Sequence, residues 1–330
     1  MRAIVYDRFG PAAQVLSLTD MPTPAPAAGE VLVDMAFSGV NPSDVKARGG
    51  TRPGVTKPPF PQIIPHSDGA GTISAVGAGV DPARIGQRVW IWNGQWQRAF
   101  GTCAEQVAVP SDQAVELPEG VDMQTGASLG IPGLTACHAV FGGGDVRGKT
   151  VLVQGGAGTV GLLAVKLAHW GGAHVIATAR GAGADHARAA GAAEVIDFTA
   201  PDLADRILAA NNGKLVDRII EPEFGVNIGT DIAVVAQNGT IAAYGSAAQP
   251  KADFNFLELM FKAATVDAIL IYLLPLAERQ KVINRLHAAL AEGALDIPVA
   301  QVFALSDTAA AHEAVEQGGR HGAVLVEMGQ

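Results

Sequence analysis

Residues 149–172 carry the clearest hydrophobic pattern in the chain. Residues 150–153 are a short apolar run rich in β-branched side chains, which predicts a buried parallel strand. Apolar positions then recur at helical spacing over residues 162–170, and a second apolar run occupies residues 174–179. This pattern predicts a βαβ unit whose helix ends at the glycines of residues 171–172.

The alternation of apolar runs and helical patterns continues to the end of the chain. The predicted elements are a helix at 185–190, a strand at 194–198, a helix at 203–210, a strand at 216–220, a helix at 228–236, a strand at 239–244, a helix at 276–292 and a strand at 323–327. Strands that alternate with helices predict a doubly wound parallel sheet. We expect the last strand to return to the N-terminal domain.

Residues up to about 120 have a different pattern, which predicts an all-β domain. Short apolar strands such as residues 31–35 alternate with turns rich in proline, glycine and aspartate. Closely spaced prolines predict an extended connector over residues 21–29, and residues 51–65 form a proline-interrupted loop of the kind that borders binding sites. The whole chain is therefore predicted to be an α/β protein with a β-rich domain and a parallel-sheet domain.

Gly156, Gly158 and Gly161 form a G-x-G-x-x-G turn between the first predicted strand of the βαβ unit and its helix. In such a turn the first glycine allows a tight bend, the second lets a pyrophosphate approach the backbone, and the third lets helix and strand pack closely. Amide groups at the start of the helix then bind phosphate oxygens. The turn predicts a dinucleotide site, and the alternative is a glycine-rich turn with a structural role alone.

The end of the second strand indicates which dinucleotide is bound. An NAD site has an acidic residue about 20 positions beyond the glycines, where it holds the ribose 2′-OH. Here Arg180 follows the strand, and the first acidic residue is Asp185. Because an arginine can hold the 2′-phosphate of NADP by charge-assisted hydrogen bonds, we predict NADPH as the cofactor. The alternative is that Arg180 is a solvated loop charge.

Composition narrows the setting of this chain. With 330 residues it is long enough for two domains, and 48% hydrophobic against 17% charged residues indicates a globular protein. A net charge of −9 argues against nucleic acid as a partner. Mean hydropathy is +0.24, yet no apolar run reaches the roughly 18 residues of a membrane span. The chain starts with a predicted strand rather than a signal peptide, and its two cysteines exclude a disulfide framework, so we expect a cytoplasmic protein.

Several motifs in order resemble one family over essentially the whole length. The motifs are Gly39–Asp44, Pro65–Gly71, the glycine turn, Gly130–Ala136, Gly245–Ser246 and Gly318–Gly322. They are similar to those of the zinc-independent quinone oxidoreductases, the zeta-crystallin-like NADPH:quinone reductases of the medium-chain dehydrogenase/reductase superfamily. The resemblance implies a GroES-like catalytic domain of residues 1–123 and 266–330, with a pseudo-barrel core, and a Rossmann NADP-binding domain of residues 124–265. It also implies a cofactor cleft between the domains and a homodimer or homotetramer.

The resemblance also assigns roles to individual residues. Asn41 and Thr135 are expected at the nicotinamide end, Arg180 at the 2′-phosphate and Phe198 against the adenine. The remaining expected cofactor contacts are Gly156, Ala157, Gly158, Thr159, Val160 and Gly161 around the pyrophosphate, with Asn227, Tyr244, Gly245, Ser246, Ala247, Ile269, Leu270, Ile271 and Arg320.

This chain departs from the family pattern in two places. Relatives carry a tyrosine shortly after the Asn-x-x-Asp element, where this chain has Val45 and Lys46. Lys46 therefore either replaces the tyrosine hydroxyl with a cation or points to water. Many relatives carry Ser-x-x-Lys after the position of Arg180, whereas here residues 181–183 are Gly-Ala-Gly, which leaves more of the NADP preference to Arg180.

Zinc alcohol dehydrogenases of the same superfamily are the first rival interpretation. Catalytic zinc needs nitrogen and sulfur ligands with one open position. Ser38 and Asn41 occupy the stretch where a cysteine would be sought, and Ser67 falls where that family's histidine belongs. We therefore predict no catalytic metal, with His66 as a hydrogen-bonded turn residue beside Asp68.

Without a metal, a quinone or another conjugated acceptor is the simplest substrate, because it takes hydride directly and is then protonated by water or a weak acid. Asn41, Lys46 and Thr135 are the candidates for orienting that acceptor. The main alternative is a reductase of activated C=C bonds in alkenals, enones, 2-haloacrylates or enoyl thioesters. A remote alternative is a non-enzymatic role, since relatives include lens crystallins and binders of AU-rich RNA. Trp90, Trp92 and Trp96 either form an aromatic wall for a flat substrate or pack inside the barrel.

Overall fold

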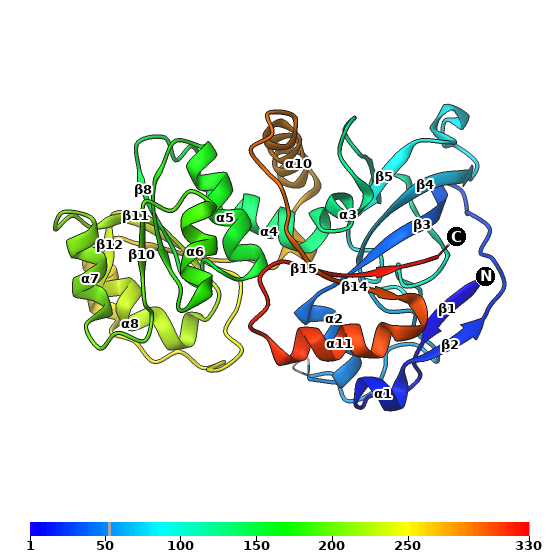
Figure 1. Ribbon diagram of the computed structural model, residues 1–330, viewed down its shortest axis with the longest axis horizontal. Coiled ribbons are helices and arrows are strands. Elements are labelled where there is room, and N and C mark those ends of the chain that lie inside the picture. The colour runs from blue at the N-terminus through cyan, green and yellow to red at the C-terminus, as the bar shows by residue number, and fades with distance from the viewer. Residues whose placement is uncertain (52–53, 330) are drawn as a thin grey trace. The chain divides into compact units, whose positions relative to one another are not determined.

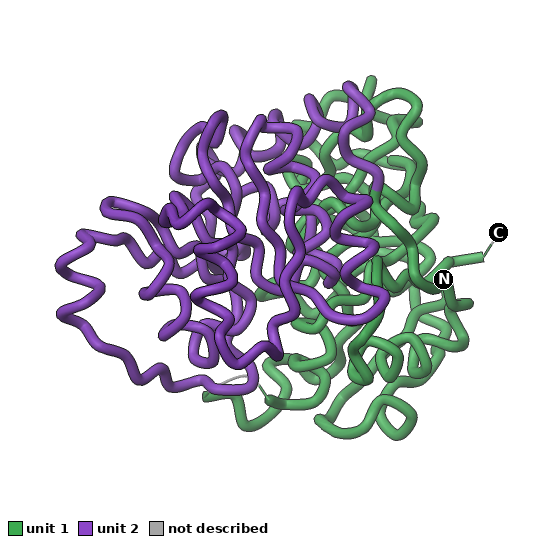
Figure 2. The backbone as a smooth tube through the Cα atoms, turned by 60° about the vertical axis from the view of Figure 1, so that its left-hand side comes forward, with its two compact units in different colours: residues 1–131, 297–330 green, residues 132–296 purple. Residues whose placement is uncertain are grey.

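The computed structural model describes residues 1–51 and 54–329, and the chain divides into two compact units. Figure 2 colours these as Met1–Ile131 with Ile297–Gln330, called here the β-rich unit, and Pro132–Asp296, called the parallel-sheet unit. The unit boundaries differ from the predicted domain boundaries, because the strand at Thr265–Ala268 pairs within the parallel sheet. The predicted functional domains stay a prediction.

The parallel-sheet unit is built on a six-stranded sheet in which every neighbouring pair is parallel. Its strands are β8 (Thr150–Val153), β9 (His174–Thr178), β10 (Glu194–Ile196), β11 (Val216–Glu221), β12 (Val235–Ala243) and β13 (Thr265–Ala268). The strand order β10-β9-β8-β11-β12-β13 reverses direction between β8 and β11, and such a reversal point is where dinucleotide folds bind their ligand. The predicted doubly wound sheet is confirmed.

Helices precede, connect and follow these strands (Figure 1). They are α4 (Leu134–Phe141), α5 (Thr159–Trp170), α6 (Ala182–Ala189), α7 (Leu203–Ala210), α8 (Phe224–Val234), α9 (Phe256–Phe261) and α10 (Leu276–Ala291). Buried aliphatic side chains from neighbouring strands, such as Leu152, Ile176 and Ile219, form one core cluster. The prediction for α7 is confirmed at both ends, whereas α6 and α8 begin earlier than predicted. The strand β10 is shorter than predicted and ends before Phe198.

The β-rich unit contains a two-stranded ribbon and a seven-stranded sheet. Its strands are β1 (Arg2–Val5), β2 (Ser17–Asp20), β3 (Glu30–Val40), β4 (Asp68–Val76), β5 (Arg88–Ile91), β6 (Gln106–Pro110), β7 (Ala114–Glu116), β14 (Val299–Ala304) and β15 (Ala323–Glu327). The long strand β3 lies at the centre and pairs antiparallel with β4, β6 and β15. Val324 of β15 lies opposite Val40 of β3, which confirms that the last strand returns to the N-terminal sheet.

The prediction that the N-terminal region contains only strands is wrong, because the β-rich unit also contains helices. The helices of this unit are α1 (Ala12–Val15), α2 (Pro42–Gly49), α3 (Met123–Gly126) and α11 (Thr308–Gln317). The start of α2 has a clear cause, since Asn41 is its N-cap and Pro42 fits the first helical position. The backbone N–H of Asn41 donates to Asp44 Oδ2 at 2.8 Å, as in a capping box. Residues 52–53 of the predicted loop over 51–65 lie outside the described residues.

Candidate active site

The glycine turn is shaped by close packing at two of its glycines. A Cβ at Gly161 would lie 2.1 Å from the carbonyl oxygen of Gly155, and a Cβ at Gly156 would lie 2.8 Å from the Cβ of Ala177. A Cβ at Gly158 would have ordinary contacts, the nearest at 3.6 Å. Gly161 therefore has the packing role expected of the third glycine, and the open position of Gly158 is the one that a pyrophosphate would approach.

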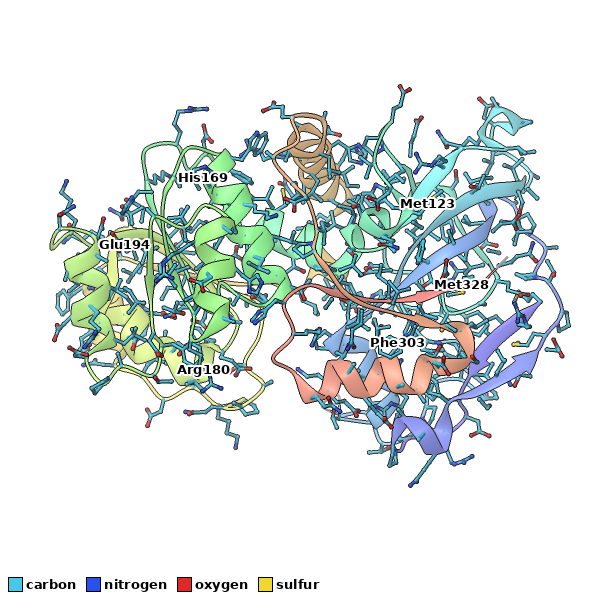
Figure 3. All side chains as sticks on the ribbon, viewed as in Figure 1. Met123, His169, Arg180, Glu194, Phe303 and Met328 are labelled. Carbon is cyan, nitrogen blue, oxygen red and sulfur yellow. The ribbon has the colours of Figure 1, made fainter. Side chains whose placement is uncertain are left out.

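The helix α5 begins directly at this turn, with Gly158 as its N-cap. Amide groups of a first helical turn have no acceptor within the helix, and the helix dipole adds a partial positive charge there. Figure 3 labels Arg180 at one end of the parallel-sheet unit and His169, in the last turn of α5, at the other. The start of α5 and the predicted 2′-phosphate ligand thus lie toward the same end of the unit.

Arg180 and Phe198 are brought together by the ends of β9 and β10. The Arg180 guanidinium carbon lies 5.4 Å from the centre of the Phe198 ring, and both side chains are exposed. This is a cation–π geometry, which holds the guanidinium without using its hydrogen-bond donors. Among the described residues no ion pair of Arg180 is found, although hydrogen bonds from Thr199 and, to a smaller extent, the charge of Arg180 lower the pKa of the exposed Asp197. The predicted phosphate ligand and the predicted adenine contact are therefore neighbours.

A chain of buried hydrogen bonds fixes the first residues after β8. The Gly155 amide N–H donates to Thr178 Oγ1 at 3.0 Å, and that hydroxyl donates to Gln154 Oε1 at 2.8 Å. The Gln154 amide group in turn donates to Asp231 Oδ1 on α8 at 3.1 Å. Gly155 has φ +64°, a left-handed conformation that suits glycine. The bend at the predicted pyrophosphate site is thus held from three elements, β8, β9 and α8.

Two acidic side chains lie buried at the reversal point of the sheet. Glu221 ends β11, Asp231 lies in α8, and both are fully buried. Glu221 accepts hydrogen bonds from the amide group of Asn227, at 3.0 and 3.2 Å, and from the backbone N–H of Glu223. Burial raises the pKa of Glu221, and burial together with the charge of Glu221 raises the pKa of Asp231 well above its usual range.

The predicted contact segment after β12 packs tightly against the loop that follows β11. A Cβ at Gly245 would lie 2.3 Å from the carbonyl oxygen of Pro222. The Ser246 hydroxyl accepts from the Gly225 N–H at 2.8 Å and donates to the Gln249 carbonyl at 2.6 Å. Ser246 therefore uses its hydroxyl within the protein.

The other expected contacts of this unit are less polar. Ile269 donates its backbone N–H to the Ala243 carbonyl at 2.7 Å, Leu270 is half exposed and Ile271 is buried. Thr135 lies buried in the first turn of α4. These positions stay predictions.

In the β-rich unit, Asn41 is held by a buried carboxyl group. The Asn41 amide donates to Asp68 Oδ2 at 2.8 Å, and the Ile131 backbone N–H lies 2.9 Å from both Asp68 oxygens. Burial raises the pKa of Asp68 well above its usual range. A Cβ at Gly130 would lie 2.1 Å from Asp68 Oδ1, so the backbone approaches this carboxyl group closely. Lys46 lies on the same helix as Asn41, and its side chain is exposed.

His66 is a buried residue at a left-handed turn, with φ 75°. Its Nδ1 lies 2.8 Å from Ser38 Oγ and its Nε2 lies 2.8 Å from His312 Nε2, so the expected hydrogen-bonded turn histidine is confirmed. Trp90 is fully buried and Trp92 is 6% exposed, which favours packing over a substrate wall for these two. Arg320 donates to the Val315 carbonyl at 3.2 Å, within the same unit.

Comparison with known proteins agrees with this geometry. Residues 27–119 match the alcohol dehydrogenase GroES-like domain, and residues 159–288 match the zinc-binding dehydrogenase domain. The rat quinone oxidoreductase is 31% identical over 99% of this chain and 97% of its own length. The chain belongs to the quinone oxidoreductase family. It is thus an oxidoreductase of the medium-chain dehydrogenase/reductase superfamily.

Solved structures in the family share the whole fold. A mycobacterial protein complexed with NADPH has a TM-score of 0.87 and 28% identity, covering 99% of this chain and 100% of its own. The Escherichia coli quinone oxidoreductase complexed with NADPH has a TM-score of 0.86 and 25% identity, with the same coverage.

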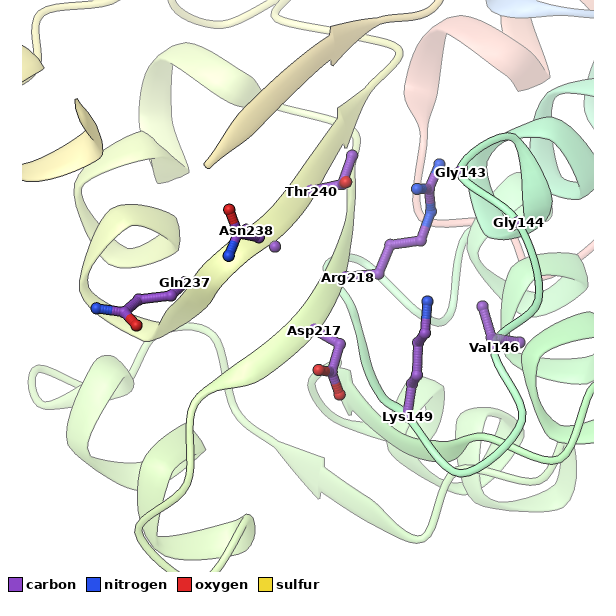
Figure 4. Close-up of a pocket in the computed structure, with 10 residues that line it drawn as sticks. Gly143, Gly144, Val146, Lys149, Asp217, Arg218, Gln237, Asn238 and Thr240 are labelled. Carbon is purple, nitrogen blue, oxygen red and sulfur yellow. The ribbon is translucent and has the colours of Figure 1, made fainter. Parts of the chain in front are cut away.

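A small polar depression lies beside the amino ends of β8, β11 and β12, where Lys149 and Arg218 project near Asp217 (Figure 4). It is at the opposite strand ends from the glycine turn.

Within residues 1–51 and 54–329, no cluster of three or more histidine, cysteine or acidic side chains has the geometry of a metal site, and no helix is long and apolar enough to span a membrane.

The sequence pattern did not predict the buried acidic side chains that form hydrogen bonds to predicted site residues such as Asn41 and Asn227. Asp68 stands inside a motif that carried the family resemblance, but the motif does not show that it bonds to Asn41. Glu221 and Asp231 carried one available signal, which is an acid placed directly after an apolar strand and another on the apolar helix that follows. No comparable signal in the sequence marked His312.

Proposed function

We propose that this protein transfers hydride from NADPH to a quinone or a similar conjugated acceptor, without zinc. The observation that carries the proposal is the glycine turn at the sheet's reversal point with Arg180 beside it, because this arrangement combines a pyrophosphate cradle with a cation for a 2′-phosphate. Two family members were solved with NADPH, which supports the same cofactor here.

The residues of the parallel-sheet unit would bind and orient the cofactor. The first turn of α5 would hold the pyrophosphate through backbone amides, and Arg180 would donate to the 2′-phosphate while Phe198 covers the adenine. Thr135 is proposed to line the nicotinamide end. NADPH supplies the hydride, so the chain itself needs no nucleophile or acid–base pair for the first step.

In the β-rich unit, the Asn41 amide is the proposed polar contact toward the reacting groups. Its nitrogen donates to Asp68, which fixes the orientation of this side chain. The exposed Lys46 is a proposed cation for a developing enolate or quinol oxygen. Ser67, at the position expected of a zinc-binding histidine, is buried and supports a metal-free reaction.

An apolar surface on the parallel-sheet unit supports the further proposal of a homodimer. Its exposed side chains are Phe256, Leu257, Met260, Phe261, Leu270, Leu273 and Leu276. They lie in the segments that precede and follow the strand β13 in the sequence, and β13 has no neighbour on its outer side in the described chain. An open edge strand with an apolar surround invites pairing with a second copy. Sedimentation of the purified protein tests this, and a monomer at micromolar concentration would contradict it.

The activity test is an acceptor panel with NADPH. Quinones, enones, 2-haloacrylates and enoyl thioesters are compared by kcat/KM, with zinc content measured on the same sample. The proposal expects quinones to rank first and activity to survive a chelator. A higher kcat/KM for an activated alkene would transfer the assignment to C=C reduction, and stoichiometric zinc with chelator-sensitive activity would overturn the metal-free mechanism. Two buried free cysteines fit a reducing, cytoplasmic setting for these assays.

A further inference from the structure

The buried acids Glu221 and Asp231 have no cation to balance them. In the part of the chain that the structure describes, neither carboxyl group forms an ion pair with a lysine or arginine. The two carboxyl groups lie instead within hydrogen-bonding reach of each other, and Asp231 Oδ2 is buried with no other partner among the described residues. Two ionised carboxylates are both acceptors and repel strongly in a buried environment, so this contact requires a proton.

The donors around the pair indicate where that proton lies. Glu221 accepts hydrogen bonds from the Asn227 amide group and from the Glu223 backbone N–H, and these bonds stabilise its ionised form. Asp231 Oδ1 receives only the Gln154 amide, and Asp231 Oδ2 is buried with no N–H or O–H donor. A proton on Asp231 Oδ2 that donates to Glu221 satisfies both groups and leaves one negative charge for the pair.

The structure extends hydrogen bonds from this pair to three segments of the proposed cofactor site. Through Gln154 and Thr178 the pair reaches the Gly155 N–H in the glycine turn. On α8 it holds the Asn227 amide nitrogen, which leaves Oδ1 of that side chain as an acceptor for a hydroxyl or carboxamide of the ligand.

The third connection passes through the residue that follows Pro222. The backbone N–H of Glu223 donates to Glu221. The carboxylate of Glu223 then accepts from the backbone N–H groups of Ala247 and Ala248 at 3.1 and 2.9 Å. The predicted contact segment after β12 is therefore tied to the same buried acid.

We propose that Glu221 and Asp231 share one proton and that this singly protonated pair positions the glycine turn, Asn227 and the segment at 244–247 for NADPH. The proposal rests on the proposed function above. Both acids act as positioning residues, because neither is exposed to a ligand. Loss of the shared proton would place two adjacent buried anions under the binding surface, which would force the side chains apart and weaken NADPH binding.

The surroundings of the pair give the direction of its pH dependence. The titratable groups that face it are Glu223, before α8, and Tyr244, after β12, and neither a carboxyl group nor a phenol can supply a positive charge. Burial and the charges of Glu221 and Glu223 raise the pKa of Tyr244, so this phenol stays neutral over the usual working range. Rising pH therefore only adds negative charge around the pair, and NADPH affinity is expected to fall as pH rises.

The decisive variant is Asp231→Asn, which removes the proton but keeps the hydrogen bonds. An asparagine oxygen would still accept from Gln154 while its amide nitrogen donates to Glu221. We expect NADPH Kd at pH 7 within about twofold of the wild type, and no loss of affinity at alkaline pH where the wild type weakens. Asp231→Ala, which removes both bonds, is expected to weaken NADPH by about tenfold. Asp205→Asn, an exposed acid on α7, is the matched control and should behave as the wild type.

Thermal unfolding of the same proteins between pH 5 and 9 measures the shared proton without NADPH. For an acid whose pKa is raised by folding, stability is fully present below the unfolded pKa and is lost as pH rises through the folded pKa. The Tm of Asp231→Asn minus that of the wild type should therefore increase with pH. Parallel Tm and Kd profiles for the two proteins, or wild-type affinity in Asp231→Ala, would overturn the proposal. If the wild type bound no NADPH, the proposed function and the positioning role would both fail. The Tm profiles would still show whether Glu221 and Asp231 share a proton.

Discussion

Each unit of the molecule buries a pair of neighbouring titratable side chains of the same type, and the two pairs have opposite chemistry. The parallel-sheet unit buries Glu221 and Asp231, and the β-rich unit buries His66 and His312 with ring centroids 5.0 Å apart. Burial raises the pKa of both carboxyl groups and lowers that of both imidazoles, that of His312 to about 3. In both places the low-dielectric interior suppresses charge.

The two pairs differ in what their hydrogen bonds reach. The carboxyl pair leads to backbone and side-chain groups at the carboxyl ends of the parallel strands, where the ligand is expected. The histidine pair joins α11 to β3 through Ser38, whose hydroxyl also lies 2.8 Å from Thr102 Oγ1. The same burial thus serves ligand positioning in one unit and helix attachment in the other. Variants in the two pairs should therefore separate binding from stability.

Glu221→Leu should give the largest effect. It leaves the Asn227 amide and the Glu223 N–H without their acceptor and removes the hydrogen-bond partner of Asp231. We expect NADPH affinity to fall by more than about tenfold and the free energy of unfolding to fall by about 2–4 kcal/mol. Fluorescence titration with NADPH and urea unfolding measure the two quantities. A Kd within twofold of the wild type would break the comparison.

Acid should act on the histidine pair instead. Since folding lowers the pKa of both imidazoles from 6.5, their contribution is fully present above about pH 6.5 and is lost as pH falls, for His312 toward about pH 3. We expect the loss to be on the order of 2–3 kcal/mol at pH 4.

His312→Gln tests this assignment. It should reduce the free energy of unfolding at pH 7 by about 1–2 kcal/mol, flatten the acid limb and leave NADPH Kd unchanged. Urea unfolding from pH 7 to pH 4 measures the slope. An unchanged acid slope in this variant would show that other groups cause the acid loss.

A smaller, matched contrast compares one hydroxyl in each unit. Thr178→Val removes the acceptor of the Gly155 N–H, so NADPH affinity should fall by about three- to tenfold. Ser38→Ala removes a hydroxyl that contacts His66, and NADPH affinity should stay within about twofold. Equal losses in the two variants would show that binding is sensitive to general loosening rather than to the network.

The smallest effect concerns the two thiols, Cys103 in the β-rich unit and Cys137 in the parallel-sheet unit. Burial raises the pKa of each to about 12, so neither forms the reactive thiolate at neutral pH. We expect no labelling by a thiol reagent within an hour in the folded protein and two equivalents after denaturation. Fast labelling of either residue at pH 7 would show that its unit opens locally.

The sequence predicted what depends on local pattern. The strand at Thr150–Val153, the helix α7 and the return of β15 to the N-terminal sheet follow from apolar periodicity and length. The glycine turn was predicted because its spacing and flanking elements are local. The helix α2 was missed although Asn41, Pro42 and Asp44 form a helix-start signal, because the surrounding residues have strand patterns.

The side-chain pairs that the sequence pattern did not predict depend on tertiary contacts. Glu221 and Asp231 meet only because α8 folds back beside β11, and His66 meets His312 across 246 positions of the chain. The Asn41–Asp68 bond likewise joins a helix start to the beginning of β4. Periodicity carries no information on such pairs, so the polar residues that hold the site became visible only in the structure.

The most direct test of the account is the dissociation constant of NADPH and of NADH for the wild type and for Arg180→Ala, at one fixed ionic strength. If the glycine turn holds the pyrophosphate and Arg180 holds the 2′-phosphate, the wild type should bind NADPH at least about tenfold more tightly than NADH. Arg180→Ala should then lose that preference while still binding NADH. Equal affinities in the wild type, or no binding of either dinucleotide, would contradict it.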